Sequence, residues 1–446
     1  MRTAKWLLLV AAAALGPGVG HAVTDPERLA TYQEFRAAFD ARRYQDALPL
    51  AEKLVTLTEE QYGKSDRALV TPLANLGTTQ YRLKDYKSAE DTYLRSVKIA
   101  TATGGTADRL LLPPLHGLGA TYYAMQQYED ATNTLQRALD LSRNLDGLLN
   151  PGQLTILDPL IGSLVSLERH AEADREFQYA ARVAESAYGA KDVRVIPYVD
   201  RYAHWLEDMG RYPAARVEYA RELTIAEVAG PRAPRLVIEP LLGIARSYRL
   251  EADNAGPDEA TPYVDPFASG LSLLTQPTAH NPNPDGEKAL QVALDTIDKT
   301  KPTDHRARGR TLMEMGDWYL CADQFDKSFG RYREAWKEFQ QAGSTDIFSA
   351  PRQLAYRAPT IAANRSPNAE RDDFEEHTVD ATFLVTREGR TKDVTLGSTE
   401  ASPAQQKSVS NALRHARYGP RLENGEPVDT PGVKFSEKVV SKKPRP

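Results

Sequence analysis

The sequence predicts a mainly α-helical protein: a right-handed α-solenoid of helix hairpins followed by a small α+β domain of ββαβ order. Three observations lead to this fold class. A pattern of small and bulky residues repeats every 42 residues over the first half of the chain. Apolar residues within each repeat recur at helical spacing. Near the C-terminus the pattern changes to the two-residue alternation of β-strands.

The N-terminus has the order of a secretory signal peptide. Arg2 and Lys5 precede the apolar run WLLLVAAAAL, and small residues surround a cleavage point after Ala22. The run is too short to span a bilayer, which requires roughly 20 residues. We therefore expect residues 1–22 to be removed and the protein to be secreted to the periplasm of a Gram-negative cell. A signal peptide retained as a membrane anchor is the alternative.

Composition sets further limits. The 446 residues carry a formal net charge of −5, so no basic surface for nucleic acid is expected, and 41% are hydrophobic, which is enough for a real core. The single cysteine, Cys321, excludes an intramolecular disulfide, and its helical surroundings favour a buried apolar role. No later segment is apolar over a membrane-spanning length, so stable membrane insertion is not expected.

Alanine recurs at a constant step of 42 residues, at Ala47, Ala89, Ala131, Ala173 and Ala215. Residues at other equivalent positions of the repeats also recur at this step. Four positions later stand Ala51, Tyr93, Leu135, Phe177 and Tyr219, and twelve positions earlier stand Phe35, Gly77, Gly119, Ile161 and Ala203. Small residues let two helices approach closely. Each repeat is therefore predicted to be a helix, a tight turn and a second, antiparallel helix that stack on the neighbouring repeats.

The tripeptide Gly117-Leu118-Gly119 begins like a glycine-rich phosphate loop, but its context argues against one. A dinucleotide loop requires a preceding strand and a further glycine at position 122, where the sequence has Tyr122. The tripeptide lies instead within a predicted helix. We interpret Gly119 as a helix-packing residue with Gly117 as its neighbour, and we expect no nucleotide and no other cofactor.

The third repeat resembles the tetratricopeptide (TPR) repeat. The matching residues are Leu118, Gly119, Tyr122, Tyr128, Ala131, Leu135 and Ala138. The period of 42 is similar to that of kinesin light chains, whose second helix is extended. Repeat four departs from the pattern, with Ile161 in place of the glycine and His170 in place of the tyrosine. The resemblance implies a groove, lined by the first helices, that binds a protein or a peptide.

The resemblance also places polar and aromatic residues on the solvent side of the first helices. The candidate peptide contacts are Asn75, Thr78, Tyr81, Arg82, His116, Tyr123, Asp200, His204 and Glu207. Such a set suits an extended peptide, because tyrosine rings cover apolar side chains while polar groups pair with its backbone. The alternative is that these are ordinary surface residues. The Lys/Asn clamp for a terminal carboxylate, known in chaperone-binding TPRs, is not reproduced.

The pattern divides the chain behind the signal peptide into six parts. They are a TPR array of about five and a half repeats (23–250), a disordered insertion loop (251–284), the last TPR helices (285–343), a Pro-containing linker (344–372), the C-terminal domain (373–440) and a basic tail (441–446). The insertion is either a tolerated surface loop or a binding segment.

The C-terminal domain is predicted to have ββαβ order. Apolar residues at alternate positions of 379–385 predict a strand with one buried face, Gly389 a turn, and 392–396 a second strand. A capping box beginning at Ser402 starts a helix, and a last strand follows over 433–439.

This domain resembles the C-terminal domain of TonB-family proteins over about 357–440. The matching segments are Phe383-Leu384-Val385, Gly389 to Val394, Asn411-Ala412-Leu413, Tyr418-Gly419-Pro420, Asn424-Gly425, Pro427-Val428 and Val433-Lys434-Phe435. The family binds a strand of an outer-membrane receptor at an exposed sheet edge. The candidate edge residues here are Val433, Lys434, Phe435 and Val439. Alternatively, Lys434 and Lys438 protect the edge from pairing.

No catalytic, cofactor or metal motif is found. The eight histidines lack metal-binding spacing, and Gly-x-Ser-x-Gly does not occur. We predict a periplasmic interaction scaffold that is not an enzyme, whose TPR groove binds a protein or peptide and whose TonB-like domain binds a second partner. The alternative is a TonB-related accessory protein in outer-membrane receptor-coupled transport. An enzyme of unrecognised type is a weaker alternative. Energy transduction is not expected, because no anchor and rod of the TonB type are recognised.

Overall fold

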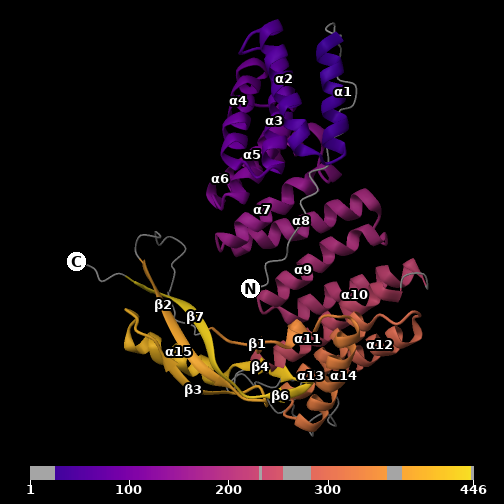
Figure 1. Ribbon diagram of the computed structural model, residues 1–446, viewed down its shortest axis with the longest axis vertical. Helices are drawn as coiled ribbons and strands as arrows, with labels where there is room; N and C mark the ends of the chain where they lie inside the picture. The colour runs from indigo at the N-terminus through magenta and orange to yellow at the C-terminus, as the bar shows by residue number, and fades with distance from the viewer. Residues whose placement is uncertain (1–25, 231–233, 255–282, 359–373, 443–446) are drawn as a thin grey trace, which may run out of the picture. The chain divides into compact units, whose positions relative to one another are not determined.

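The computed structural model describes residues 26–230, 234–254, 283–358 and 374–442. The predicted signal peptide and most of the predicted insertion lie outside these residues. The chain divides into two compact units, Met1–Tyr202 and Ala203–Pro446, each of which is described by itself. Both contain helix hairpins, and the second also contains the strands (Figure 1).

The first unit consists of consecutive helix pairs. Its helices are α1 (Pro26–Asp40), α2 (Tyr44–Tyr62), α3 (Val70–Arg82), α4 (Tyr86–Gly104), α5 (Leu112–Ala124), α6 (Tyr128–Asp146), α7 (Leu154–Ser166) and α8 (His170–Tyr188), and α9 (Ile196–Asp208) begins in it. The second helices of successive pairs begin at residues 44, 86, 128 and 170, which is the predicted step of 42. The helical repeat is thus confirmed.

A short 3₁₀ turn precedes each of the first helices α3, α5, α7 and α9. The turns are η1 (Arg67–Leu69), η2 (Arg109–Leu111), η3 (Pro151–Gln153) and η4 (Val193–Val195). The side chain before each turn caps it by accepting a bond from the backbone N–H two residues later: Asp66, Asp108, Asn150 and Asp192. These capping residues also recur at a step of 42 and were not predicted.

The predicted crossing residues are buried. Ala47, Ala89, Ala131 and Ala173 in the first unit and Ala215 in the second have no exposed surface. A Cβ on Gly119 would lie 2.5 Å from Cγ of Leu135, and one on Gly117 would lie 2.2 Å from Cζ of Tyr93. Both glycines therefore permit close packing of side chains from neighbouring helices, and Gly117 packs as closely as Gly119.

The second unit continues with hairpins and ends in strands. Its helices are the end of α9, α10 (Tyr212–Ala229), η5 (Pro234–Val237), α11 (Ile238–Asn254), α12 (Pro284–Lys299), α13 (His305–Cys321), α14 (Phe325–Gln341), η7 (Thr345–Phe348) and α15 (Pro403–His415). Its strands are β1 (Arg352–Ala355), β2 (Phe374–Val385), β3 (Thr391–Leu396), β4 (Arg417–Gly419), β5 (Arg421–Glu423), β6 (Glu426–Val428) and β7 (Thr430–Lys442).

Two predicted boundaries differ from the structure. Helix α11 continues to Asn254 and α12 begins at Pro284, both inside the predicted loop 251–284. The predicted linker 344–372 begins with ordered structure, because Phe348 is fully buried and packs at 5.6 Å against Phe339. Strand β1 follows within that linker and pairs with β4.

Strands β3, β2 and β7 form an antiparallel sheet in that order, so β7 is an edge strand, as β3 is. Phe383 of β2 faces Val433 of β7, and His377 faces Val439. Helix α15 packs on this sheet, and Ser402 and Gln405 form the predicted capping box. The short strands β4, β5 and β6 between α15 and β7 were not predicted.

Cys321 is buried in α13, and burial raises the pKa of its thiol well above the ordinary value. None of the helices that the structure describes has the length and apolar content that a bilayer crossing requires.

The glycine packing makes a testable prediction in the hairpin of α13 and α14. In Gly316→Ala the new Cβ would lie 2.6 Å from Cε1 of Tyr332, whose ring is fully buried. Overpacking of this kind costs about 1–3 kcal/mol, which we expect as a fall in the free energy of unfolding measured with urea. Gly330→Ala is the matched control, because apart from its chain neighbours and the backbone of its own helix no atom lies within 4 Å of its Cβ position. Equal stability of the two variants would contradict the packing role.

Candidate recognition surface

The predicted groove residues lie on first helices, as expected from the repeat. In the first unit α3 packs beside α5, and α5 beside α7. We call the solvent side of these three helices the first-helix face. Asn75, Thr78, Tyr81 and Arg82 lie on α3, and His116 and Tyr123 lie on α5. Asp200 lies on α9 within the first unit, whereas His204 and Glu207 belong to the second unit.

Two tyrosines give the first-helix face its aromatic part. Tyr81 and Tyr123 are half-buried, and each ring packs on the tyrosine that begins the following helix, Tyr86 at 5.6 Å and Tyr128 at 6.0 Å. Tyr123 also covers Gly162 of α7, where a Cβ would lie 2.6 Å from the tyrosine hydroxyl. Burial raises the pKa of both phenols, so both rings remain neutral at physiological pH.

Other candidates in the first unit are held by the array itself. The Thr78 hydroxyl donates to the Ala74 carbonyl at 2.8 Å and lies 2.9 Å from the Tyr93 hydroxyl. His116 Nε2 lies 3.1 Å from the Thr155 carbonyl, to which it donates, and burial lowers the pKa of the imidazole. These side chains join neighbouring helices, which limits what they offer to a ligand.

The step of 42 defines two columns on the first helices. The first column contains Thr78, Ala120, Gly162, His204 and Arg246, and the second contains Tyr81, Tyr123, Val165, Glu207 and Arg249. Aligning Gly316 with Gly119 adds Asp317 to the first column. Both columns are uncharged in the first unit. In the second unit their members are charged or titratable, with the single exception of Leu320 at the end of the second column.

Two charged column positions of the second unit, Glu207 and Arg246, pair with each other. Arg246 Nε donates to Glu207 Oε2 at 2.9 Å, and its terminal nitrogen donates to the Tyr219 hydroxyl at 3.0 Å. The same nitrogen lies 3.2 Å from Nε2 of His204, which is exposed. Glu207, predicted as a peptide contact, is therefore buried in an ion pair. The prediction of an exposed Glu207 was wrong because its partner, Arg246, lies one repeat later in the chain, in the other column.

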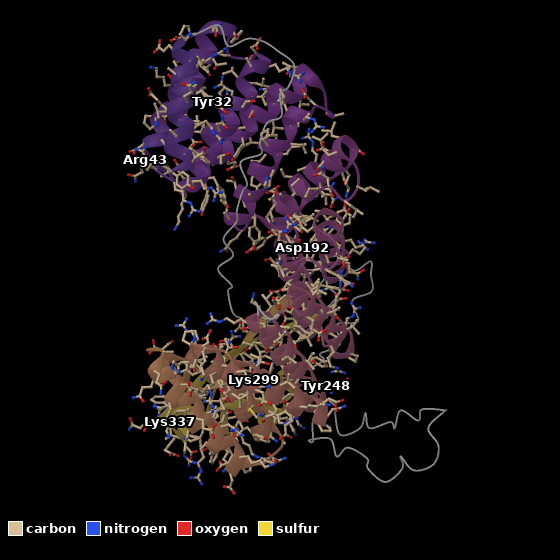
Figure 2. The ribbon with its side chains drawn as sticks, turned by 90° about the vertical axis from the view of Figure 1, so that its right-hand side faces the viewer. Tyr32, Arg43, Asp192, Tyr248, Lys299 and Lys337 are labelled. Carbon is tan, nitrogen blue, oxygen red and sulfur yellow. The ribbon has the colours of Figure 1, made fainter. Side chains whose placement is uncertain are left out.

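The pairing continues along α11 and α13. Arg249, which is 3% exposed, donates to Glu314 at 3.1 Å and to the Leu354 carbonyl at 3.4 Å. Beside it Tyr248, labelled in Figure 2, lies under the Arg216 guanidinium at 4.0 Å. Asp317, which is 1% exposed, accepts two bonds from Arg352 of β1. Arg246, Arg249 and Asp317 were not predicted from the sequence.

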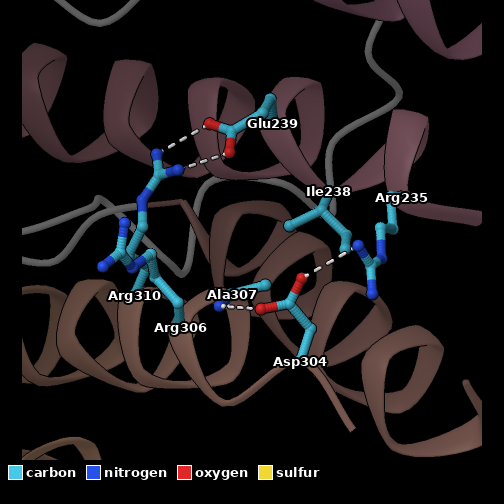
Figure 3. Close-up of a pocket in the computed structure, with 7 residues that line it drawn as sticks. All are labelled: Arg235, Ile238, Glu239, Asp304, Arg306, Ala307 and Arg310. Atoms are coloured by element: carbon cyan, nitrogen blue, oxygen red, sulfur yellow. Dashed lines mark hydrogen bonds and ion pairs between the residues drawn. The ribbon is translucent and has the colours of Figure 1, made fainter. Parts of the chain in front are cut away.

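A surface pocket of about 210 Å³ lies where α11 and α13 begin (Figure 3). Three arginines line it, but two are paired with acids of the same pocket. Arg310 makes a two-pronged pair with Glu239 at 2.6 and 2.7 Å, and Arg235 lies 3.5 Å from Asp304. The third, Arg306, is exposed. Most of the positive charge is thus neutralised, and the pocket is not a built anion site.

The predicted edge residues divide between the two faces of β7. Val439 is buried in the core under α15, and Val433 and Phe435 pack against that core, with the Phe435 ring 4.8 Å from Tyr356. Lys434 and Lys438 are exposed on the other face. Within the described parts of the chain, no cluster of histidine, cysteine and acidic residues is suited to a metal ion.

The model of the family described as tetratricopeptide repeat matches residues 36–102 and 81–144. Residues 36–144 carry tetratricopeptide repeats. No match to the chain was found among curated proteins. No family match covers the C-terminal strands, so their TonB-like character stays a prediction.

Solved TPR structures are similar to this chain at low identity. A putative kinesin light chain from Podospora anserina with nearly identical TPR-like repeats is 15% identical, with a TM-score of 0.42, over 47% of this chain and 99% of the other. BtubC (BKLC) from P. vanneervenii is 14% identical, with a TM-score of 0.36, over 70% of this chain and 92% of the other. The C-terminal part of a TPR repeat-containing protein from Cytophaga hutchinsonii is 10% identical, with a TM-score of 0.45, over 69% and 94%.

The buried column pairs lead to a stability prediction. Glu207→Ala leaves the Arg246 guanidinium without its carboxylate, which we expect to lower the free energy of unfolding of the second unit by about 2–3 kcal/mol. Glu239→Ala is the matched control, because its pair with Arg310 is largely exposed and is worth at most about 1 kcal/mol. Both are measured by urea unfolding. A Glu207 variant no less stable than the Glu239 variant would show that the column pair is not structural.

Proposed function

We propose that this chain is a secreted, periplasmic interaction scaffold whose tetratricopeptide repeats bind an extended peptide on the first-helix face of the first unit. TPR proteins generally mediate protein–protein interaction. The observation that carries the proposal is the change of chemistry along the two columns. Their uncharged members, with Tyr81 and Tyr123, belong to the first unit, whereas the charged members of the second unit pair internally.

The ligand chemistry follows from the side chains that remain. Neutral, half-buried tyrosine rings offer apolar area at small entropic cost, because a tyrosine has only two side-chain torsions. The amide of Asn75 lies on the same helix as Tyr81 and supplies polar groups for a peptide backbone. An extended segment with apolar side chains at alternate positions fits this face better than a highly charged one.

A second partner is proposed for the C-terminal strands. Strand β7 is an edge of its sheet, which favours addition of a partner's strand, as in TonB-family domains. An outer-membrane receptor or another member of a periplasmic complex is the corresponding partner. If this edge is the active part of the protein, the chain is a TonB-related accessory in receptor-coupled transport, and the repeat array is a spacer for the C-terminal strands.

Site-specific photocrosslinking separates these functions. A benzoylphenylalanine at position 75 or 81, on the first-helix face, should capture the same partner in living cells, because both positions contact one peptide. The same residue at Leu94, an exposed apolar position on α4, is the matched control and should not capture it. Tyr123→Ala should reduce capture at position 81 at least about tenfold. Capture that is equal at Leu94 would exclude the proposed face.

The same experiment with the crosslinker at Lys438 tests the strand edge. Capture of an outer-membrane receptor there, with none at positions 75 and 81, would favour the accessory function over the scaffold. Capture of different partners at the two surfaces is the outcome expected for the scaffold.

Secretion makes a prediction of its own. The mature protein should begin at Val23 and should be released with the periplasmic contents by osmotic shock, because the apolar run ends well before Ala22. Mass spectrometry of the purified protein measures its N-terminus. A chain that retains Met1, or that remains in the cytoplasm, would contradict the predicted export.

A further inference from the structure

The second unit contains an extended segment of its own chain against its first helices. Strand β1 contacts α11, and its partner strand β4 contacts α13 (Figure 1). In the register of β1 and β4, Arg352 pairs with Gly419 and Gln353 with Tyr418. A short extended segment therefore lies against α11 and α13, which are first helices and correspond by the repeat to α3, α5 and α7.

Arg352 is the polar anchor of this segment. Its two terminal nitrogens donate to the two carboxylate oxygens of Asp317 at 3.0 and 2.7 Å. Asp317 is 1% exposed and also accepts from the Tyr332 hydroxyl at 2.6 Å. A planar guanidinium matches a carboxylate in this two-pronged way, which an ammonium group cannot reproduce.

The backbone behind Arg352 is shaped for the guanidinium. A Cβ on Gly419 would lie 2.7 Å from a terminal nitrogen of Arg352, so only glycine leaves room for the side chain at that position. Arg352 thus lies against a buried acid of α13 and a glycine of β4, and the acid is itself held by a buried tyrosine of α14.

Two further contacts hold the rest of the segment. Arg249 of α11, itself paired with Glu314, donates to the Leu354 carbonyl. The Leu354 side chain is buried in the core cluster that contains Leu312 and Trp318 of α13. Arg249 of α11 binds the backbone of the segment, Asp317 of α13 binds its arginine, and the apolar core around α13 binds its leucine. Separate contacts to the backbone and to two side chains allow a site to select a peptide sequence.

We propose that α11 and α13 form a recognition site for an extended peptide that carries arginine two residues before leucine, and that residues 352–355 of the same chain are its resident ligand. The site is distinct from the first-helix face of the first unit and does not depend on the partner proposed there. Because the resident segment is tethered, its effective concentration is of millimolar order, and a free peptide enters only when this segment is weakened.

A labelled peptide tests the proposal with the full-length protein. The probe is a fluorescein-labelled copy of residues 349–357, SAPRQLAYR, and binding is followed by fluorescence anisotropy. Arg352→Ala empties the arginine position of the tethered segment, so it should bind the probe at least about tenfold more tightly than the wild type does. A probe with glutamine in place of the arginine at position 352 should bind that variant at least about tenfold more weakly.

A second variant and a control keep the test decisive. Arg352→Lys retains a cation beside Asp317 and preserves the fold if Arg352→Ala unfolds, and it should also admit the arginine probe more readily than the wild type. Arg333→Lys is the matched control, because it changes an exposed two-pronged pair between α14 and Glu426 and should not admit the probe. Equal binding of both probes, or no gain in folded Arg352 variants as judged by circular dichroism, would overturn the proposal.

Discussion

The close approach of paired helices is the constraint on which the rest of the structure depends. In the hairpins of α5 with α6 and of α13 with α14 a glycine faces a bulky side chain: Gly119 faces Leu135, and Gly316 faces Tyr332. Such packing is tight enough that one added methyl group must displace a buried ring. It fixes where each first helix lies relative to the next, and therefore which side chains share a surface.

On this scaffold the same two column positions have opposite roles in the two units. In the first unit they hold threonine, glycine, alanine, valine and tyrosine, which leave a neutral face with aromatic rings. In the second unit Glu207, Arg246, Arg249 and Asp317 occupy them, and these charges pair with neighbouring helices or, for Asp317, with strand β1. A buried charge must be paired, so the second unit uses these positions to join its own elements.

The helical repeat was predictable from the sequence, because the alanine and glycine columns report helix packing directly. The strand pattern over 379–396 and the capping box at Ser402 were equally visible, since each is a local signal. The candidate site was predicted less well. Glu207 was taken for a surface residue, because its pairing with Arg246 depends on the next repeat. Strand β1 was missed because its partner, β4, lies more than sixty residues later.

The pairing of Arg352 with Asp317 also affects the order in which the second unit folds during synthesis. When α13 and α14 leave the ribosome, the Arg352 guanidinium that pairs with the Asp317 carboxylate has not yet emerged. Arg352 follows 35 residues after Asp317, and Gly419, which completes the enclosure, emerges later still. The last helix pair therefore reaches its final form only near the end of synthesis. In a chain that stops before β4, the enclosure of Arg352 beside Asp317 is incomplete and apolar surface stays uncovered, and chaperones and proteases recognise such surfaces.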